Sequence, residues 1–307
     1  MKWKQKTATI PIETAPNTVP TEEEECVEQE RFEFWHRFCE TKTAVFVLVV
    51  LVLIILMAVF ANFITDPANV TFQDMNARSL SPSLEHPFGT DGFGRDIFAR
   101  IIYGARSSLF IAFATIAISC LAGLIFGVSC GYFGGRFDTI VMRIVDVFMC
   151  LPPLLFSLSI VAALGNGMGN LILAVSITMT PFFTRVIRAT VMSVMSMDYI
   201  EAARAAGASH LHIILRHVIP NCMGPIIVEA TISLSMMIML AASLSFIGMG
   251  VQPPSPEWGA MLSDAREYMR DSPWMVLAPG LAIMITSLAF NLLGDGVRDA
   301  LDPRMKK

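Results

Sequence analysis

Five long stretches of this 307-residue chain contain no charged side chain. A helix that crosses a bilayer needs about 20 consecutive apolar residues, and the first stretch is almost purely aliphatic over VFVLVVLVLIILMAVF. The third stretch is long enough for two passes, with GNGMGN at 165–170 as the turn between them. We therefore predict an all-α, polytopic membrane protein with six transmembrane helices. The uncharged stretches cover residues 43–65, 107–135, 147–184, 230–256 and 272–294.

The overall composition points to the same class. Only 16% of the residues are charged, whereas soluble domains carry about 25%, and the mean hydropathy is +0.60. A net charge of −4 does not favour nucleic acid as a partner. The six cysteines show no C-x-x-C spacing, and four lie in or beside predicted spans. We expect buried thiols here, with neither a metal site nor a disulfide framework.

The chain divides into four parts along its length. Residues 1–30 are polar and acidic, lack the apolar core of a signal peptide, and are predicted to be a disordered tail. Residues 31–105 hold an interfacial helix, RFEFWHRFCETK, then the first span and an outer loop. The alternative is that this helix only extends the first span. Residues 106–296 form a five-helix core with a loop at 199–220, and residues 297–307 form a second tail.

The distribution of basic residues predicts the orientation. Lys and Arg accumulate in cytoplasmic loops of membrane proteins. With the N-terminus inside, 16 of the 22 Lys and Arg residues fall on the cytoplasmic side and 6 on the outer side. We therefore expect both termini and the 199–220 loop to be cytoplasmic.

The 199–220 loop, YIEAARAAGASHLHIILRHVIP, is too charged for lipid and too rich in helix formers for a simple connector. Gly207 fits a left-handed helix C-terminus, and Ser209 is placed to cap a second helix. We predict two short helices joined by a glycine elbow and ending at Pro220, and we call this segment the knuckle. The alternative is a loop that only packs beneath the bundle.

The knuckle resembles the EAA signature of ABC importer permeases. The match consists of Glu201, Ala202 and Ala203, then Gly207 six residues after the glutamate and Pro220 thirteen residues after the glycine. The signature usually has Ile three residues before that proline and Leu one residue before it. This chain has His217 and Ile219 at those positions, which suggests a particular subfamily.

Three further segments narrow the resemblance to the C-type permease of dipeptide and oligopeptide importers. They are HPFGTDGFGRDIFARIIYGAR at 86–106, SFIGMGVQPPSPEWGAML at 245–262 and NLLGDGVRDALDPR at 291–304. This resemblance implies the type I permease fold and a place in the bacterial inner membrane. Nickel and glutathione importers share the same permease type, so they remain alternatives to peptide uptake.

The resemblance also implies a set of partners. A homologous second permease would complete the translocation pathway within membrane lipid, and a solute-binding protein would deliver substrate from outside. Two ATPase subunits would bind ATP-Mg and dock on the five EAA positions of the knuckle. This chain has no G-x-x-x-x-G-K-[ST] loop, so we expect it to hold no cofactor and to catalyse no reaction.

Glycine recurs every fourth residue in the second predicted span. Such a stripe lets another helix approach closely. We interpret it as static packing within the chain, and a sliding contact with the second permease is the alternative. The stripe consists of Gly123, Gly127, Gly131 and Gly135.

Three charged residues lie in or beside the spans. Arg143 and Asp146 are three residues apart, a spacing at which helical side chains pair. Glu229 borders the fourth uncharged stretch, where a charge in lipid costs a few kcal/mol. We expect it to face the bundle and pair with Arg185 or Arg188, and a role in gating is the alternative.

The turn GTDGFGRD at 89–96 belongs to the predicted outer loop. We expect Asp91, Arg95 and Asp96 to bond the local backbone or one another, rather than the substrate. Around this loop and the PPSPEW segment, the resemblance places the docking of the binding protein.

Two rival functions remain. A membrane enzyme would need paired carboxylates, histidines or cysteines at span depth, and a secondary transporter would need several ionisable groups near the midplane. Only Glu229 comes near either requirement.

Overall fold

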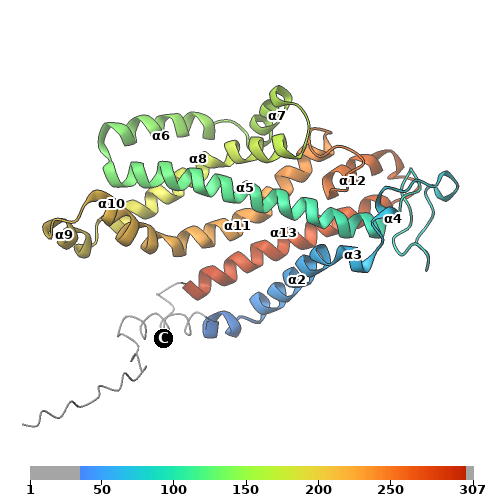
Figure 1. Cartoon of the computed structure of the whole chain (residues 1–307), viewed down its shortest axis with the longest axis horizontal. Helices are drawn as coiled ribbons and strands as arrows, with labels where there is room; N and C mark the ends of the chain where they lie inside the picture. The colour runs from blue at the N-terminus through green and yellow to red at the C-terminus, as the bar shows by residue number, and fades with distance from the viewer. Residues whose placement is uncertain (1–34, 302–307) are drawn as a thin grey trace, which may run out of the picture.

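The computed structural model describes residues 35–301, so the predicted tails lie largely or wholly outside the described residues. Within this range every regular element is a helix (Figure 1). Five helices are long and apolar enough to cross a membrane, and a bent pair supplies a sixth pass. The five are α2 (Lys42–Val59), α5 (Ile97–Phe133), α8 (Met168–Met195), the continuous helix His210–Phe246 that contains α11 (Ile219–Phe246), and α13 (Trp274–Leu301).

The chain runs back and forth along the long axis of the molecule (Figure 1). One end, which we call the inner end, carries α9 (Asp198–Ala205). The start of α2 and the end of α13 also point toward the inner end. The opposite, outer end carries α3 (Ala61–Ile64), α4 (Ala68–Thr71), the 3-10 turn Met75–Ala77 and α12 (Trp258–Ala265), which leads into the 3-10 turn Arg266–Tyr268.

The third pass differs from the predicted one. Instead of beginning at Val147, it consists of α6 (Gly135–Met149) and α7 (Pro153–Leu164), which meet at an angle of 91°. The break falls at the Pro152-Pro153 pair because the residue before a proline is driven out of the α region, and Pro152 has ψ 128°. The turn predicted at 165–170 is confirmed, since α7 ends just before Gly165 and α8 begins at Met168.

The second pass begins earlier than the predicted start at Ser107. Asp96 caps α5 by accepting a hydrogen bond from the backbone N–H of Ala99, so the helix starts at Ile97. At 1.5 Å per residue its 37 residues make it about 56 Å long, nearly twice the thickness of a hydrocarbon core. The outer part of α5 therefore extends beyond the membrane, and its arginines belong to a helix rather than to a loop.

The glycine stripe packs α5 against α8. A Cβ added at Gly123 would lie 2.5 Å from the Cβ of Phe183, and one at Gly127 would lie 2.9 Å from the Cβ of Ile187. Gly131 is equally close to α8. Gly135 is an error in the predicted stripe: α5 has ended at Phe133, and a Cβ at Gly135 would meet nothing within 4 Å.

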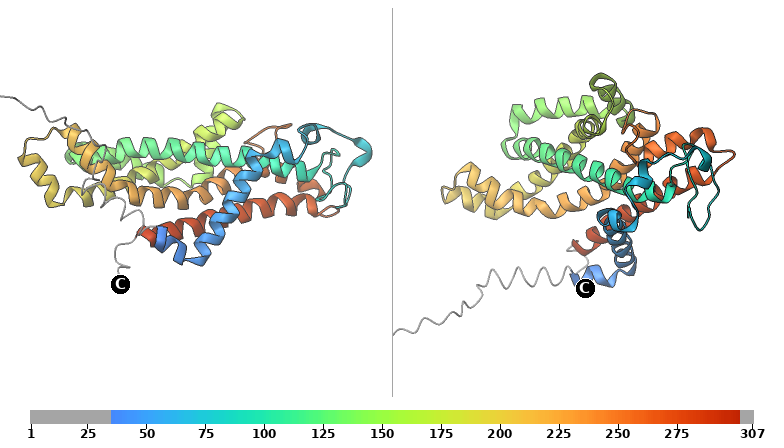
Figure 2. Two further views of the ribbon diagram at one scale, coloured as in Figure 1. Left: turned by 60° about the horizontal axis from the view of Figure 1, so that its bottom comes forward. Right: turned by 45° about the vertical axis from the view of Figure 1, so that its right-hand side comes forward.

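The first span is the least buried of the five long membrane helices. In Figure 2, α2 crosses α13 on the outside of the other helices, and only four of its 18 residues are buried. Residues 35–40 form a separate helix before it, interrupted at Thr41, and Phe38 packs against Ala44 and Ala300. The break at Thr41 separates this helix from α2, and its interfacial position stays a prediction.

Candidate functional site

The knuckle begins as predicted, with a helix that ends at a glycine elbow. α9 stops before Gly207, which has φ +82°. The N–H of Gly207 donates to the carbonyl of Arg204, and the N–H of Ala208 donates to that of Ala203. These two bonds form a Schellman motif, which requires a left-handed residue at the glycine position. Beyond the elbow Ser209 caps α10 (His210–Ile213) through the N–H of His212.

The second knuckle helix does not end at Pro220, which corrects the prediction. α10 passes through a π-helical turn, Ile214–Val218, and continues as α11. Because proline has no N–H to donate, it disrupts the regular hydrogen-bond ladder, and a π-helical turn is one local rearrangement that keeps a helix continuous. The elbow is therefore joined to the fifth span by one unbroken helix, His210–Phe246.

The knuckle is anchored to the inner end of α5. The hydroxyl of Tyr132 lies 2.7 Å from Nδ1 of His210, and the guanidinium of Arg204 lies over the Tyr132 ring at 5.7 Å. Ile200 and Ile213 are buried beneath the two helices. The sequence reasoning missed Tyr132 and His210, because nothing local signals that an aromatic at the end of one span meets a histidine 78 residues later.

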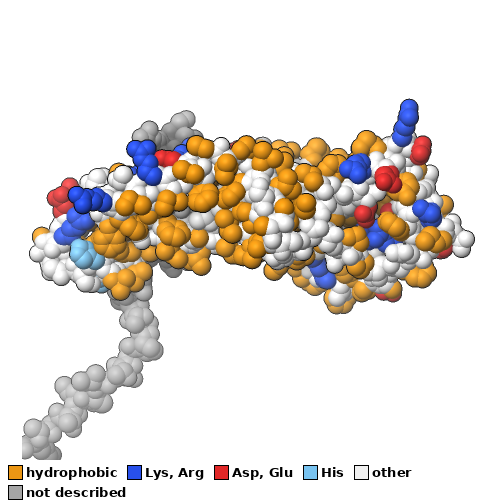
Figure 3. Space-filling view, turned by 90° about the horizontal axis from the view of Figure 1, so that it is seen from above, with side chains coloured by type: hydrophobic (Ala, Val, Ile, Leu, Met, Phe, Trp, Pro, Cys, Tyr) orange, Lys and Arg blue, Asp and Glu red, His pale blue; other side chains and the backbone are white. Residues whose placement is uncertain are grey.

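Most of the knuckle surface is exposed to solvent. Glu201, Ala202, Gly207 and Pro220 are exposed, whereas Ala203 is partly buried against the core. Two leucines of the second helix, Leu211 and Leu215, are also exposed. Figure 3 shows charged side chains and a histidine at this end, separated by a largely hydrophobic belt from the charges at the other end.

The predicted pair Arg143–Asp146 is wrong. Asp146 instead forms an ion pair with Arg185 of α8, and Asp138 forms a second one with Arg188, with Nη2 to Oδ2 at 2.6 Å. The physical reason is that α6 lies against α8, so its acidic side chains meet the arginines of that helix.

The predicted partner of Glu229 is also wrong. Both candidate arginines, Arg185 and Arg188, are already paired with carboxylates of α6. Glu229 itself is half-buried on α11 and makes no ion pair within residues 35–301.

The outer end contains a buried ionic network that we call the outer cluster: Asp91, Arg95, Arg100 and Asp264. Arg95 and Arg100 are each only 2% exposed. Nε of Arg95 lies 2.6 Å from Oδ2 of Asp91, and its Nη2 lies 3.0 Å from Oδ2 of Asp264. Arg100 approaches the same two carboxylates at 3.6 and 3.9 Å. The two positive and two negative charges balance inside the fold.

The turn at 89–96 behaves as predicted. Besides the Asp91–Arg95 bond, Oδ2 of Asp96 lies 2.7 Å from Nδ1 of His86, so these side chains bond locally. The prediction did not include Asp264, whose contribution comes from a segment 169 residues away.

Glu257 caps α12 from a fully buried position. Its carboxylate accepts hydrogen bonds from the backbone N–H groups of Gly259 and Ala260, at 2.9 and 2.8 Å, and from the hydroxyl of Ser108 at 3.2 Å. Burial raises the pKa of this carboxyl group, and the backbone hydrogen bonds oppose that shift. Next to it Trp258 donates from Nε1 to the carbonyl of Ile101 at 3.0 Å. These bonds fix α12 onto α5.

Comparison with known proteins identifies the family. Residues 123–307 match the family described as "Binding-protein-dependent transport system inner membrane component". The chain belongs to this family. Residues 32–82 match a second family, the N-terminal transmembrane domain of oligopeptide transport permease C. This second region contains α2.

Relatives of known name cover nearly the whole chain. A dipeptide transport system permease protein, DppC, from Alkalihalophilus pseudofirmus is 41% identical over 95% of each chain. A glutathione transport system permease protein, GsiD, from Escherichia coli is 41% identical over 96% of this chain and 97% of its own. The inward-facing MetNI methionine ABC transporter covers 67% of this chain and 98% of its own, with a TM-score of 0.57 at 18% identity, which supports the fold alone.

Proposed function

We propose that this chain is a permease subunit of an ATP-driven importer and helps to form the pathway for di- and oligopeptides across the inner membrane. A second, homologous permease completes that pathway, and a solute-binding protein delivers the substrate. Two relatives that are named as dipeptide and di/tripeptide permeases support peptide uptake. The family description supports dependence on a binding protein.

Energy enters through the knuckle in this proposal. The supporting observation is the unbroken helix His210–Phe246, which links the exposed elbow at Gly207 to the fifth span. A stiff helix passes on a displacement that a flexible loop would absorb. Two ATPase subunits bind ATP-Mg and hydrolyse it, and one of them docks on α9 and the elbow, while this chain supplies the pathway.

Glutathione is a second candidate substrate. The glutathione permease is as similar to this chain as the dipeptide permease is, at 41% identity each. Calorimetry on the cognate solute-binding protein separates the two: peptide binding without glutathione binding supports the proposal, and the reverse result supports glutathione.

A single substitution tests the coupling role. Gly207→Leu places a large side chain where a Cβ meets nothing within 4 Å, so the chain should still insert and fold. Docking of the ATPase should fail because that open space is the contact surface. The measurements are capture of the ATPase by the tagged permease and substrate-stimulated ATP hydrolysis.

Gly248→Leu is the matched control. Gly248 has φ +89°, has nothing within 4 Å of an added Cβ, and ends α11 with the same two Schellman bonds, but it lies at the outer end. It carries the same backbone strain and should leave ATPase capture intact. Equal capture by both variants would contradict the coupling role, and uptake by the chain without any ATPase would contradict the proposed function.

A further inference from the structure

One narrow stripe of α11 is exposed although the outer half of this helix is otherwise buried. α11 packs against α5, α8, α12 and α13. Of the 13 residues at 233–245, ten are buried and three are exposed: Met236, Met239 and Ser243. Their spacing of three and four residues places them on one face of the helix. Glu229 lies seven residues before Met236, hence on the same face, and is half-buried. We call these four residues the α11 stripe.

The stripe carries a charged group at membrane depth. Glu229 lies 17 residues from the outer end of α11 at Phe246, which is about 26 Å along the helix and within the ~30 Å thickness of a hydrocarbon core. Its carboxylate forms neither an ion pair nor a hydrogen bond with another described residue. Beside the stripe, Asn291 of α13 is also exposed, and its Oδ1 accepts a hydrogen bond from the hydroxyl of Ser235 at 2.8 Å. A charged side chain within a span faces the bundle interior or a water-filled cavity rather than lipid.

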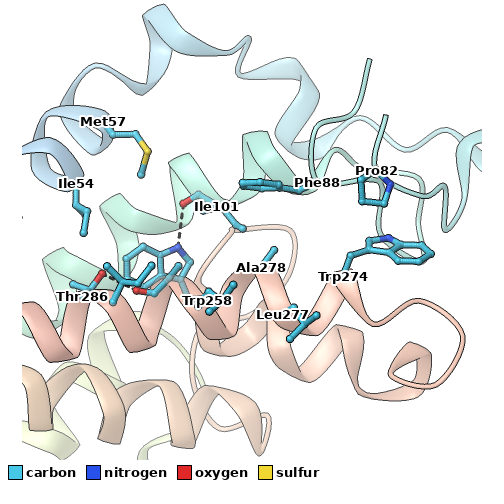
Figure 4. Close-up of a pocket in the computed structure, with 13 residues that line it drawn as sticks. Ile54, Met57, Pro82, Phe88, Ile101, Trp258, Trp274, Leu277, Ala278 and Thr286 are labelled. Carbon is cyan, nitrogen blue, oxygen red and sulfur yellow. Dashed lines mark hydrogen bonds between the residues drawn. The ribbon is translucent and has the colours of Figure 1, made fainter. Parts of the chain in front are cut away.

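The surface around α2 has the opposite composition. Every exposed residue of α2 from Phe46 to Val59 is Phe, Val, Leu or Ile. α2 touches α13 at the inner ends of the two helices, where a Cβ added at Gly296 would lie 2.5 Å from the Cβ of Ala44. Farther out they diverge around an apolar pocket, to which α2 contributes Ile54 and Met57 (Figure 4). Among the described residues that line this pocket, none is charged. The α11 stripe is therefore a different kind of surface from that of the first span.

We propose that the α11 stripe lines the translocation pathway and that Glu229 binds the protonated α-amino group of the substrate. This assignment rests on the proposed function, and it holds for peptides and for glutathione because both carry a free amino group. A carboxylate accepts a charge-assisted hydrogen bond from an ammonium group, so Glu229 offers a contact that does not depend on the side chains of the peptide. Met236 and Met239 meet those varied side chains, since methionine is flexible and repacks around different shapes.

Reaction with a charged, water-soluble methanethiosulfonate tests whether the stripe meets water. Met239→Cys is compared with Leu53→Cys in the assembled importer, placed in nanodiscs and supplied with ATP, loaded binding protein and substrate. The two native side chains are similarly exposed, at 57% and 59%, but Leu53 lies on the apolar surface of α2. The reagent attacks the thiolate, which forms in water and not in hydrocarbon, so Met239→Cys should react at least about tenfold faster. Mass spectrometry assigns the adduct to the new thiol rather than to a native cysteine. Equal rates would overturn the lining role.

Two substitutions test the contact between Glu229 and the amino group. Uptake into vesicles is measured at saturating loaded binding protein, with dialanine or glutathione, whichever the cognate binding protein binds. Glu229→Gln keeps the size but loses the charge and should lower the uptake rate about tenfold, because transfer from the binding protein then lacks the ionic contact. Glu229→Asp keeps the carboxylate and should stay within about threefold of the parent.

The parent and the second permease provide the controls. Copurification of the second permease with Glu229→Gln should match the parent. A loss of uptake that accompanies loss of the second permease would place Glu229 in the interface between permeases and overturn the substrate contact. Parent-like uptake by Glu229→Gln would also overturn it while leaving the proposed function intact. If the parent complex with its ATPases takes up neither substrate, the proposed function itself fails.

Discussion

The two ends of the molecule both carry charged side chains, but they use them differently. At the outer end Arg95 and Arg100 are 2% exposed, and both contact the carboxylates of Asp91 and Asp264. At the inner end Glu201 of the knuckle is exposed and makes no ion pair among the described residues. The outer cluster therefore holds this chain together, whereas the exposed Glu201 is available to another protein.

The first prediction tests the structural role of the outer cluster. Arg100→Ala should destabilise the chain by about 3–5 kcal/mol, because removing one member of a buried ionic network leaves the others uncompensated. Thermal unfolding in nanodiscs measures this. Arg270→Ala, an exposed arginine at the same end, is the control and should unfold like the parent. A parent-like melting temperature for Arg100→Ala would remove the distinction between the two ends.

The second prediction concerns the helix pair that connects the two ends. Gly127→Ala should cost about 1–3 kcal/mol, since its Cβ would lie 2.9 Å from both the Cβ of Ile187 and the carbonyl oxygen of Thr184. Gly169→Ala, with open space around the added Cβ, should be neutral or slightly stabilising. Thermal unfolding that ranks the two variants equally would show that the glycines of α5 are not a packing requirement.

The third prediction addresses how the knuckle is attached. Tyr132→Phe removes the hydroxyl that contacts His210 and should cost about 1 kcal/mol. Because the effect is local, hydrogen exchange should accelerate over 198–213 while the outer end stays protected. Tyr103→Phe breaks a similar hydroxyl contact, to Asn62 at the outer end, and should not affect that segment. Equal acceleration in both variants would mean that the knuckle has no separate anchor.

The fourth prediction has the smallest effect on stability. Glu201→Ala should change the free energy of unfolding by less than about 0.5 kcal/mol, because the side chain is exposed. The same variant should weaken capture of the ATPase, since its carboxylate faces the partner in the proposed complex. A marked loss of stability together with full ATPase capture would mean that Glu201 stabilises this chain and does not bind a partner.

The sequence predicted the helical class, the six passes and the glycine elbow, since each depends on local information. The length of an uncharged stretch identifies a membrane-spanning helix. A left-handed residue at the end of a helix favours glycine. The sequence predicted the ends of the helices less accurately. Arg100 falls in the predicted outer loop, but the structure places it in α5. Its buried guanidinium donates to the carbonyl of Val70 and lies near the carboxylates of Asp91 and Asp264.

By itself, then, the sequence determined which segments are apolar, where the chain turns and which motif the knuckle carries. The tertiary structure decided the pairing of charges: Asp146 with Arg185 instead of Arg143, and no ion pair for Glu229 within residues 35–301. It also decided that the knuckle continues into the fifth span, and that α2 and α13 diverge around a pocket. The reason is that an ion pair or a pocket depends on which helices become neighbours, and helix neighbours are set by packing across the whole fold.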